Sequence, residues 1–466
     1  MDEAASSGDA KQIVLQSLAF LYPWIRPYYS LPISDYACRL FEIPHTRIKL
    51  EIRRCALTKL LDAVKKAGRR SGLPEDVVGQ ICGELERRRV LQTGPHLLLL
   101  FEAEAYYTHA FSLLGLKAHG CSSYLSYAVS TVSLVEKPRK GPGWLTVNGT
   151  PVNLFGLSRS RMIGYNLLSG PGSYRFALLP AEPNICPEAL TLLEGLLPKQ
   201  GFERPAHALK AANIALWPKI FGDGFAFLQI DDEDVTDLVV SHLRDENSWL
   251  RTRLFEAPKL ASDIVAGFDK LAAGPWGSWV ARGTDFFWFY EDGKRHRLRL
   301  ESGELVHATT GKKLVRFTAA EIVERLVNRS LVPNLFLMFL VISILPGVRA
   351  LGGSHQPIYY PLMRYALCKA LEAADMDADL RHALVVDDMP AAWGHRVIEC
   401  DQNPFDLYRA GRMGEASDHT GRFATVPFMD ACGSMSSFAG DSSWLELYRR
   451  IQLETIAPTN AEWGFS

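Results

Sequence analysis

The first residues that could carry chemistry stand in a short turn at positions 93–96. Thr93 and Gly94 are followed by a proline and then by His96. The turn separates a short apolar segment from a helical pattern, so its backbone N–H groups and the positive end of the helix could bind an anion. The threonine hydroxyl and the imidazole would lie beside that anion. An ordinary strand-to-helix turn with a helix cap is the alternative interpretation.

A second polar cluster follows the most apolar part of the chain. Its members are small or form short-range hydrogen bonds: Gly352, Gly353, Ser354, His355 and Gln356, with Tyr359 close behind. Paired glycines let a ligand approach the backbone closely, and the polar side chains donate or accept hydrogen bonds. We therefore expect a ligand-binding loop at this position. A helix start that is capped by Ser354 and binds no ligand is the alternative.

The two histidines of these clusters are the candidates for proton transfer. His96 and His355 are the only plausible proton carriers near these loops, because histidine is the side chain most often used as a catalytic acid or base. The remaining cluster residues are expected to bind the ligand: Thr93, Gly94, Gly352, Gly353, Ser354, Gln356 and Tyr359. The chain has no nucleophile elbow, no P-loop, no GxGxxG and no HExxH, so standard hydrolase, kinase and nicotinamide functions lose support. We predict no metal site.

The segments around the two clusters predict a parallel α/β sheet. Residues 90–92 are typical of a short strand, residues 97–116 of a helix, and residues 120–135 of a second strand, which together make a β-α-β unit. The apolar run at residues 335–345 is rich in β-branched side chains and precedes the paired glycines, which favours a buried strand. Ligands of α/β proteins lie at the carboxyl ends of strands, so both clusters are expected at one sheet edge.

Three polar residues of the predicted helix share one of its faces. Glu102, Tyr106 and His109 lie four and then three residues apart, a spacing that could hold a metal or relay a proton. Polar pairs at this spacing are far more common on a solvent-exposed face. We therefore give these residues no functional role.

Pattern changes along the chain predict five regions. Residues 47–69 and 74–89 show helical spacing, residues 224–230 resemble a strand followed by a helix with an acidic start, and residues 285–300 resemble a hairpin. The predicted regions are an N-terminal helical region (1–89), the first half of the core (90–136), an insertion region with strands and a hairpin (137–330), the second half of the core (331–375) and a C-terminal mixed region (376–466).

The composition of the chain argues against some classes of binding partner and favours one cellular compartment. Lysine and arginine number 51 against 52 acidic residues, which argues against a nucleic-acid or anionic-membrane binder. The eight cysteines include no CxxC pair, which fits a reduced cytoplasm better than a zinc knuckle or a disulfide framework. The N-terminus lacks the basic and apolar parts of a signal peptide. The apolar window at 335–345 is about half as long as a membrane span.

The order of the motifs resembles that of a known enzyme family. Residues 91–96 read Leu-Gln-Thr-Gly-Pro-His, and residues 345–359 carry Leu-Pro, then Gly-Gly five residues later, then a tyrosine after five more. This order is similar to that of the cysteine ligases of bacillithiol synthesis, over roughly residues 20–370. The family's acidic Glu-Asp-His-Asp box falls on residues 126–133, which contain no carboxylate or imidazole, and Gln356 replaces a family glutamate. The chain therefore resembles a divergent member.

The resemblance implies a fold and a reaction class. The fold would be a Rossmann-like parallel-sheet core with connecting-peptide insertions and a helical N-terminal region, and ATP or ADP would be the nucleotide. We expect a divergent ligase-like enzyme that couples an amine or amino acid to a second small molecule in specialised metabolite or thiol biosynthesis. The enzyme would be a cytoplasmic homodimer with no nucleic-acid or membrane partner. A catalytically silent scaffold or binding partner that keeps the fold is the alternative.

Overall fold

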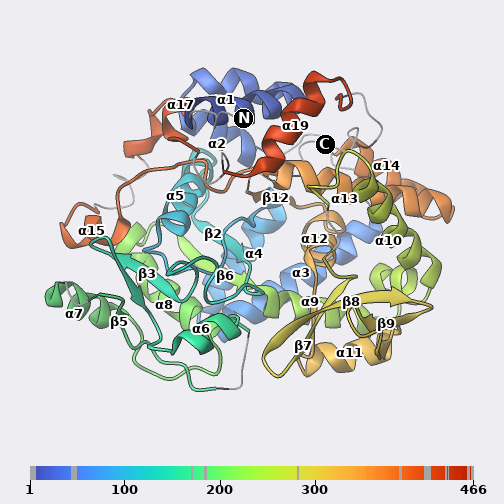
Figure 1. The fold of residues 1–466 in the computed structure, drawn as a ribbon, viewed down its shortest axis with the longest axis horizontal. Helices are drawn as coiled ribbons and strands as arrows, with labels where there is room; N and C mark the ends of the chain where they lie inside the picture. The colour runs from blue at the N-terminus through green and yellow to red at the C-terminus, as the bar shows by residue number, and fades with distance from the viewer. Residues whose placement is uncertain are drawn as a thin grey trace, which may run out of the picture.

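Five short strands form the main sheet of the protein (Figure 1). They are β1 (Val90–Gln92), β2 (Ser123–Ala128), β6 (Ala226–Asp231), β12 (Arg349–Gly352) and β13 (Ala391–Trp393). Their order is β13-β12-β1-β2-β6, and every neighbouring pair is parallel. Nearly all of their residues are buried. This burial is typical of a parallel sheet with both faces covered.

This computed structural model describes most of the chain. The described residues are 7–42, 50–168, 172–182, 186–280, 283–353, 355–387, 391–413, 421–435, 438, 440–458 and 462. Ser354, which we predicted to bind a ligand, lies outside them.

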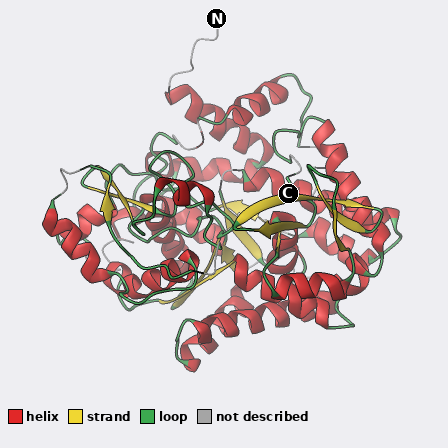
Figure 2. Cartoon of the chain, turned by 60° about the horizontal axis from the view of Figure 1, so that its bottom comes forward, coloured by secondary structure: helices red, strands yellow, loops and turns green. Residues whose placement is uncertain are grey.

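Helices cover both faces of the main sheet, as Figure 2 shows. Tyr124 and Leu125 are neighbours in β2 but belong to different buried clusters, because successive side chains of a strand point to opposite faces. The Tyr124 cluster includes α1 (Ser7–Leu21), α2 (Ile33–Phe41), α5 (Ala103–Ala118) and α8 (Pro205–Phe221). The Leu125 cluster includes α3 (Glu51–Arg70), α4 (Glu75–Arg88), α9 (Asp232–Arg244) and α10 (Pro258–Ala273). Helix α13 (Gln356–Ala373) contributes to both.

Two smaller antiparallel sheets lie on opposite sides of the main sheet in Figure 1. The first has three strands, β3 (Trp144–Val147), β4 (Thr150–Asn153) and β5 (Leu179–Pro180), with α6 (Arg159–Gly164) and α7 (Pro187–Leu196) nearby. The second has the order β10-β9-β8-β7-β11, with bounds β7 (Phe287–Glu291), β8 (Lys294–Glu301), β9 (Glu304–His307), β10 (Lys313–Arg316) and β11 (Leu331–Pro333). Helix α11 (Ala319–Val327) packs against β10 and β11.

The remaining elements connect these layers. They are η1 (Pro23–Ser30), η2 (Leu250–Phe255), α12 (Leu335–Phe339), η3 (Leu340–Ile344), α14 (Ala378–Val386), α15 (Pro404–Arg409), α17 (Phe428–Ala431) and α19 (Ser442–Gln452). Helix α19 packs against α1, so the two ends of the described chain meet at the top of Figure 1.

Most of the local predictions are confirmed. The helices predicted at residues 47–69 and 74–89 correspond to α3 and α4, the strand predicted at residues 224–230 corresponds to β6, and the hairpin predicted at residues 285–300 corresponds to β7 and β8. The α/β class, the parallel sheet and the helical N-terminal region are therefore as expected.

The predicted strand at residues 335–345 is wrong. These residues form α12 and then the π-helix η3, and the strand that leads to the glycines begins at Arg349. An apolar run buried on all sides has no periodicity by which a helix could be told from a strand. The helix predicted from residue 97 also begins later, at Ala103. Across the described ranges, no helix has both the length and the apolar character needed to cross a membrane.

Candidate functional site

The strand order places a change of direction between β1 and β12. The chain passes from β1 to β2 and β6 on one side of the sheet, and then returns to β12 and β13 on the other side. Ligands of open α/β sheets commonly bind at such a switch point, at the carboxyl ends of the strands. Residues 93–96 follow β1 and residues 353–356 follow β12, so the two clusters predicted from the sequence occupy this position.

Thr93 and Gln356 join the two loops. The Thr93 Oγ1 atom lies 3.1 Å from Gln356 Oε1 and 3.1 Å from the Leu351 carbonyl oxygen. The Gln356 amide donates to the Ala350 carbonyl oxygen at 3.0 Å, and both side chains are buried. The Tyr359 hydroxyl reaches Gln356 Oε1 at 3.5 Å. Burial raises the pKa of Tyr359, so its hydroxyl stays a hydrogen-bond donor.

The glycines of the two loops make room for side chains of the protein itself. A Cβ atom at Gly94 would overlap the side chain of His395, and one at Gly352 would overlap the amide of Gln356. At Gly353 the nearest atom, His395 Cδ2, would lie 3.6 Å away, which is ordinary contact. The close approach that we predicted for a ligand is therefore taken by His395 and Gln356 at two of the three glycines.

His395 is a buried imidazole that the sequence analysis missed. It follows β13, and its backbone N–H donates to the Gly352 carbonyl oxygen at 3.0 Å. The Thr108 hydroxyl lies 2.8 Å from Nδ1, and Glu104 Oε1 lies 3.1 Å from Nε2. Because the carboxylate of Glu104 only accepts, His395 Nε2–H donates to it, and Nδ1 of the neutral imidazole accepts the Thr108 hydroxyl. Thr108 Oγ1 in turn accepts the backbone N–H of Arg396 at 3.2 Å.

The charge state of His395 follows from its surroundings. Burial, with a smaller contribution from His96, lowers the pKa of His395 to about 3, so the imidazole is neutral at physiological pH. Arg396 forms an ion pair with Glu104 and balances that carboxylate. Thr108 is fully buried and its hydroxyl both donates and accepts, so it cannot act as a nucleophile. These contacts fix the orientation of His395 in the floor of the switch point.

His96 is a partly exposed imidazole at this edge. Its side chain is 37% exposed, and Nδ1 pairs with the carboxylate of Glu136. When Nδ1–H donates to a carboxylate, Nε2 carries the lone pair and can accept a proton. Glu136 was not singled out in the sequence, because nothing in its local pattern connects it to His96, which lies 40 residues away.

His355 lies in different surroundings. Its Nε2 atom pairs with Asp441 Oδ2 at 2.8 Å, and Asp441 also caps helix α19 through the Ser443 N–H. The His355 ring contacts Trp279 and Trp444, with centroids 5.0 Å and 6.0 Å away. Within the described ranges no hydrogen bond or ring contact joins His355 to His96. The two predicted catalytic histidines thus belong to separate clusters, and His355 connects the β12 loop to α19.

A carboxylate from another segment contacts the loop after β2, although residues 126–133 themselves contain no carboxylate. Asp232, the first residue of α9, accepts the backbone N–H groups of Ser130 at 2.7 Å and Thr131 at 2.6 Å, and it also accepts the Tyr127 hydroxyl. Burial raises the pKa of Asp232. Its side chain is fully enclosed and its oxygens are used, so Asp232 fixes the loop and does not contact a ligand.

Comparisons with known proteins add no assignment to this geometry. No model of a known protein family matches the sequence, and no curated protein matches it significantly. The functional argument therefore depends on the residues at the switch point and on the motif order described above.

Proposed function

We propose that the chain is a divergent, ligase-like enzyme with a Rossmann-like core that couples an amine or amino acid to a second small molecule. The observation that carries the proposal is the convergence of the loops after β1, β12 and β13 around Thr93, Gln356 and His395. Counted along the chain, the five parallel strands have the order 5-4-1-2-3, which is the order of a Rossmann-like sheet. The motif order of the sequence supports the reaction class. A cytoplasmic location is part of the same proposal.

His96 is the residue that we assign to proton transfer. When an amine attacks an electrophilic carbon of a substrate that carries its own leaving group, the C–N bond forms as the bond to the leaving group breaks. The amine also loses a proton, and a positioned base accepts that proton. Glu136 orients His96, and the exposed imidazole is accessible to a small molecule. Thr93, Gln356 and the neutral His395 form a rigid floor beside it.

The nucleotide expectation needs a separate test of fit. The turn at residues 93–96 suggested an anion site and the paired glycines a close approach of a ligand, but His395 and Gln356 fill the space beside Gly94 and Gly352. Arg396, which follows His395 in the chain, is paired with Glu104. These residues do not form a phosphate cradle for ATP or ADP, so we route no step of the mechanism through a nucleotide.

The same observation favours a second candidate function. Side chains of the protein fill the space beside the glycines and form hydrogen bonds within the protein, so the fold can persist without a ligand. A catalytically silent scaffold or binding partner is therefore the alternative. It predicts a partner protein that co-purifies with the chain and no product with any amine.

Substrate identification should come before the mutational test. Mass spectrometry of small molecules retained by the purified protein, followed by titration calorimetry with ATP, ADP and amino acids, would name the ligands. Retention of an amine or amino acid and formation of a coupled product support the enzyme. Absence of any such ligand or product, together with a stable partner protein, would replace it with the scaffold.

Replacement of His96 by alanine is expected to lower kcat by about 10²–10⁴-fold while the fold stays intact. The reason is that His96 is exposed and removes a proton in the rate-determining chemistry, so its loss affects turnover more than stability. Rates measured from about pH 5 to about pH 9 should also lose their dependence on the imidazole. His382→Ala, at an exposed histidine of α14, is the matched control and should keep full activity. Unchanged turnover in His96→Ala would contradict the assignment.

A further inference from the structure

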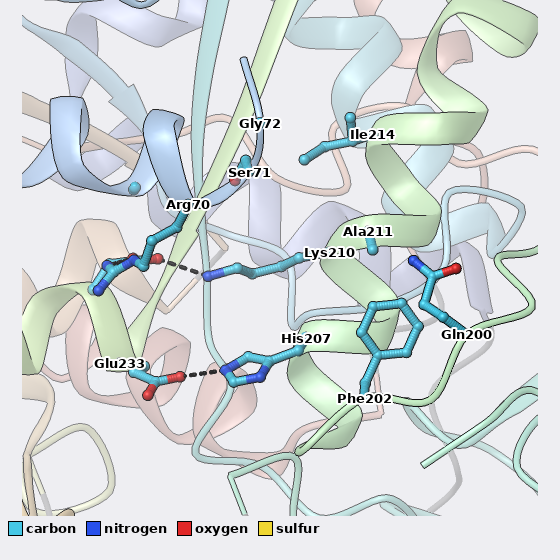
Figure 3. A pocket seen from close by; sticks show the side chains of 12 residues that line it. Arg70, Ser71, Gly72, Gln200, Phe202, His207, Lys210, Ala211, Ile214 and Glu233 are labelled. Carbon is cyan, nitrogen blue, oxygen red and sulfur yellow. Dashed lines mark hydrogen bonds and ion pairs between the residues drawn. The ribbon is translucent and has the colours of Figure 1, made fainter. Parts of the chain in front are cut away.

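A cavity lies at the start of α9, which directly follows β6, the edge strand two strands away from β1. It has a volume of about 600 Å³ and is lined by the end of α3, the first half of α8, the start of α9 and a loop. Figure 3 shows Lys210 and His207 extending from α8 toward Arg70 and Glu233. The side chains of Phe202 and Ile214 form an apolar part of the cavity wall. This volume is within the range of small-molecule sites.

The cations of this cavity have more donors than their carboxylate partners use. Lys210 Nζ donates to Asp231 Oδ1 at 3.0 Å and to Asp234 Oδ2 at 2.8 Å, which occupies two of its three N–H groups. Arg70 donates one N–H to Asp237 at 2.6 Å and another to Asp234, out of five that a guanidinium carries. Both cations can therefore bind a further acceptor without breaking these pairs.

Exposure decides which of the charged groups a ligand would meet. The side chain of Arg70 is 48% exposed, whereas that of Asp234 is 3% exposed and that of Asp231 is fully buried. Both oxygens of Asp234 are held by Arg70 and Lys210. The oxygens of Glu233 are likewise held, by His207 at 2.7 Å and Arg329 at 3.3 Å. The carboxylate oxygens of the residues that line the cavity are thus already paired, whereas Arg70 and Lys210 keep further N–H groups.

Lys210 keeps its charge in this position. Burial alone would lower the pKa of Lys210, but the carboxylates of Asp231 and Asp234 raise it above its usual value. A buried ammonium ion that keeps an unused N–H at the wall of a cavity favours an anionic ligand.

We propose that this cavity binds a small organic anion, a carboxylate or phosphate monoester with an apolar or aromatic body. The anionic group would accept hydrogen bonds from Arg70 and Lys210, and the body would pack against Phe202 and Ile214. The site uses α3, α8 and α9, whereas the proposed reaction uses the loops after β1, β12 and β13. The existence of this anion site therefore does not depend on the proposed function.

The test compares three probes of similar shape on the full-length protein. They are 3-phenylpropionate, phenyl phosphate and the neutral 3-phenylpropionamide, titrated with detection by ligand-observed NMR and by calorimetry. We expect at least one of the two anions to bind saturably. The amide should bind at least about tenfold more weakly than that anion, because the charge-assisted hydrogen bonds are lost. Which anion binds more tightly distinguishes a carboxylate from a phosphate ligand.

Variants then locate the bound anion. Arg70→Gln should weaken anion binding by about tenfold or more. Arg69→Gln is the matched control, because Arg69 is the neighbouring, exposed residue of α3 and pairs with Glu75 away from the cavity. Ala211→Phe should block binding by filling the cavity without removing a charge. Thermal melts confirm that each variant is folded.

Several results would overturn the proposal. Equal affinity for the amide and the anions would show that charge is not recognised. An Arg70→Gln variant that binds like the parent, or an Ala211→Phe variant that binds normally while folded, would place the probe elsewhere. Failure of both anions to bind at all would mean that the cavity has no such ligand.

Discussion

Between about pH 7.5 and about pH 5, three buried histidines are together expected to lower the free energy of unfolding by about 6 kcal/mol. They are His109, His242 and His395, and burial lowers the pKa of each from 6.5 to about 3. The carboxyls of Glu102 and Asp231 offset part of this loss, because burial raises their pKa values and the folded chain takes up their protons in the same pH range. In this pH range the unfolded chain binds a proton at each of these histidines and the folded chain does not. The stabilisation is thus fully present above pH 6.5 and is lost as the pH falls.

The surroundings of His109 illustrate why the charged form is excluded. Its ring lies among Tyr124, Trp217 and Phe227, with centroids 5.5 Å, 5.9 Å and 5.7 Å away. Nδ1 hydrogen-bonds with the Tyr124 hydroxyl at 2.9 Å, whereas Nε2 is buried and has no hydrogen-bond partner in the part of the chain that the structure describes. Protonation would place a positive charge in this apolar cluster, so acid favours the unfolded chain.

Urea unfolding at several pH values measures this effect directly. The free energy of unfolding should fall by about 1.4 kcal/mol per pH unit for each histidine once the pH is well below 6.5. His109→Gln should reduce the slope by the contribution of one proton, whatever it does to stability at neutral pH. His382→Ala, at an exposed position, should leave the slope unchanged. A slope that His109→Gln leaves unchanged would show that His109 is not buried in its neutral form.

Alanine in place of Gly94 is expected to destabilise the protein by about 2–3 kcal/mol. The backbone at Gly94 is not left-handed, so alanine introduces no dihedral strain there. The cost comes from the added Cβ, which would overlap the Cβ and Cγ atoms of His395. His395 is held by Thr108 and Glu104 and cannot move aside without breaking those hydrogen bonds.

A glycine in an unobstructed position provides the control for this substitution. Gly79 lies inside α4 with no atom within 4 Å of its added Cβ, so Gly79→Ala should stabilise the protein by about 0.5–1 kcal/mol. Adding His395→Gly to Gly94→Ala should recover part of the lost stability, whereas His395→Ala should recover less because its Cβ remains. The free energies come from denaturant unfolding of all four variants. Equal effects of alanine at positions 94 and 79 would contradict the packing shown here.

The sequence predicted the switch point better than the groups around it. Thr93 and Gln356 were found because a turn motif and a glycine pair are local patterns, and strand order then brought them together. His395 was missed because β13 has only three residues, too few to show a period of two. His109 was placed on a solvent-exposed face, but the aromatic cluster that buries it comes from β2, β6 and α8.

Side-chain partners from distant segments explain the other differences. Residues 126–133 contain no acidic group, yet Asp232 supplies a carboxylate to this loop from the start of α9. The acidic run at residues 231–234 was correctly expected to start a helix, and its Asp231–Asp234 capping box is formed. The sequence pattern could not predict that Lys210 and Arg70 both pair with Asp234.

The central pairing of β1 with β12 also sets the timing of folding during synthesis. Gln92 and Leu351 are 259 residues apart, so at ordinary rates of translation roughly 10–50 s separate their emergence from the ribosome. Until then one side of β1 lacks its neighbour in the sheet, and its unpaired N–H and C=O groups can pair with another nascent chain. Chaperone capture and slow, cool expression should therefore raise the yield of native protein more than any change at the surface.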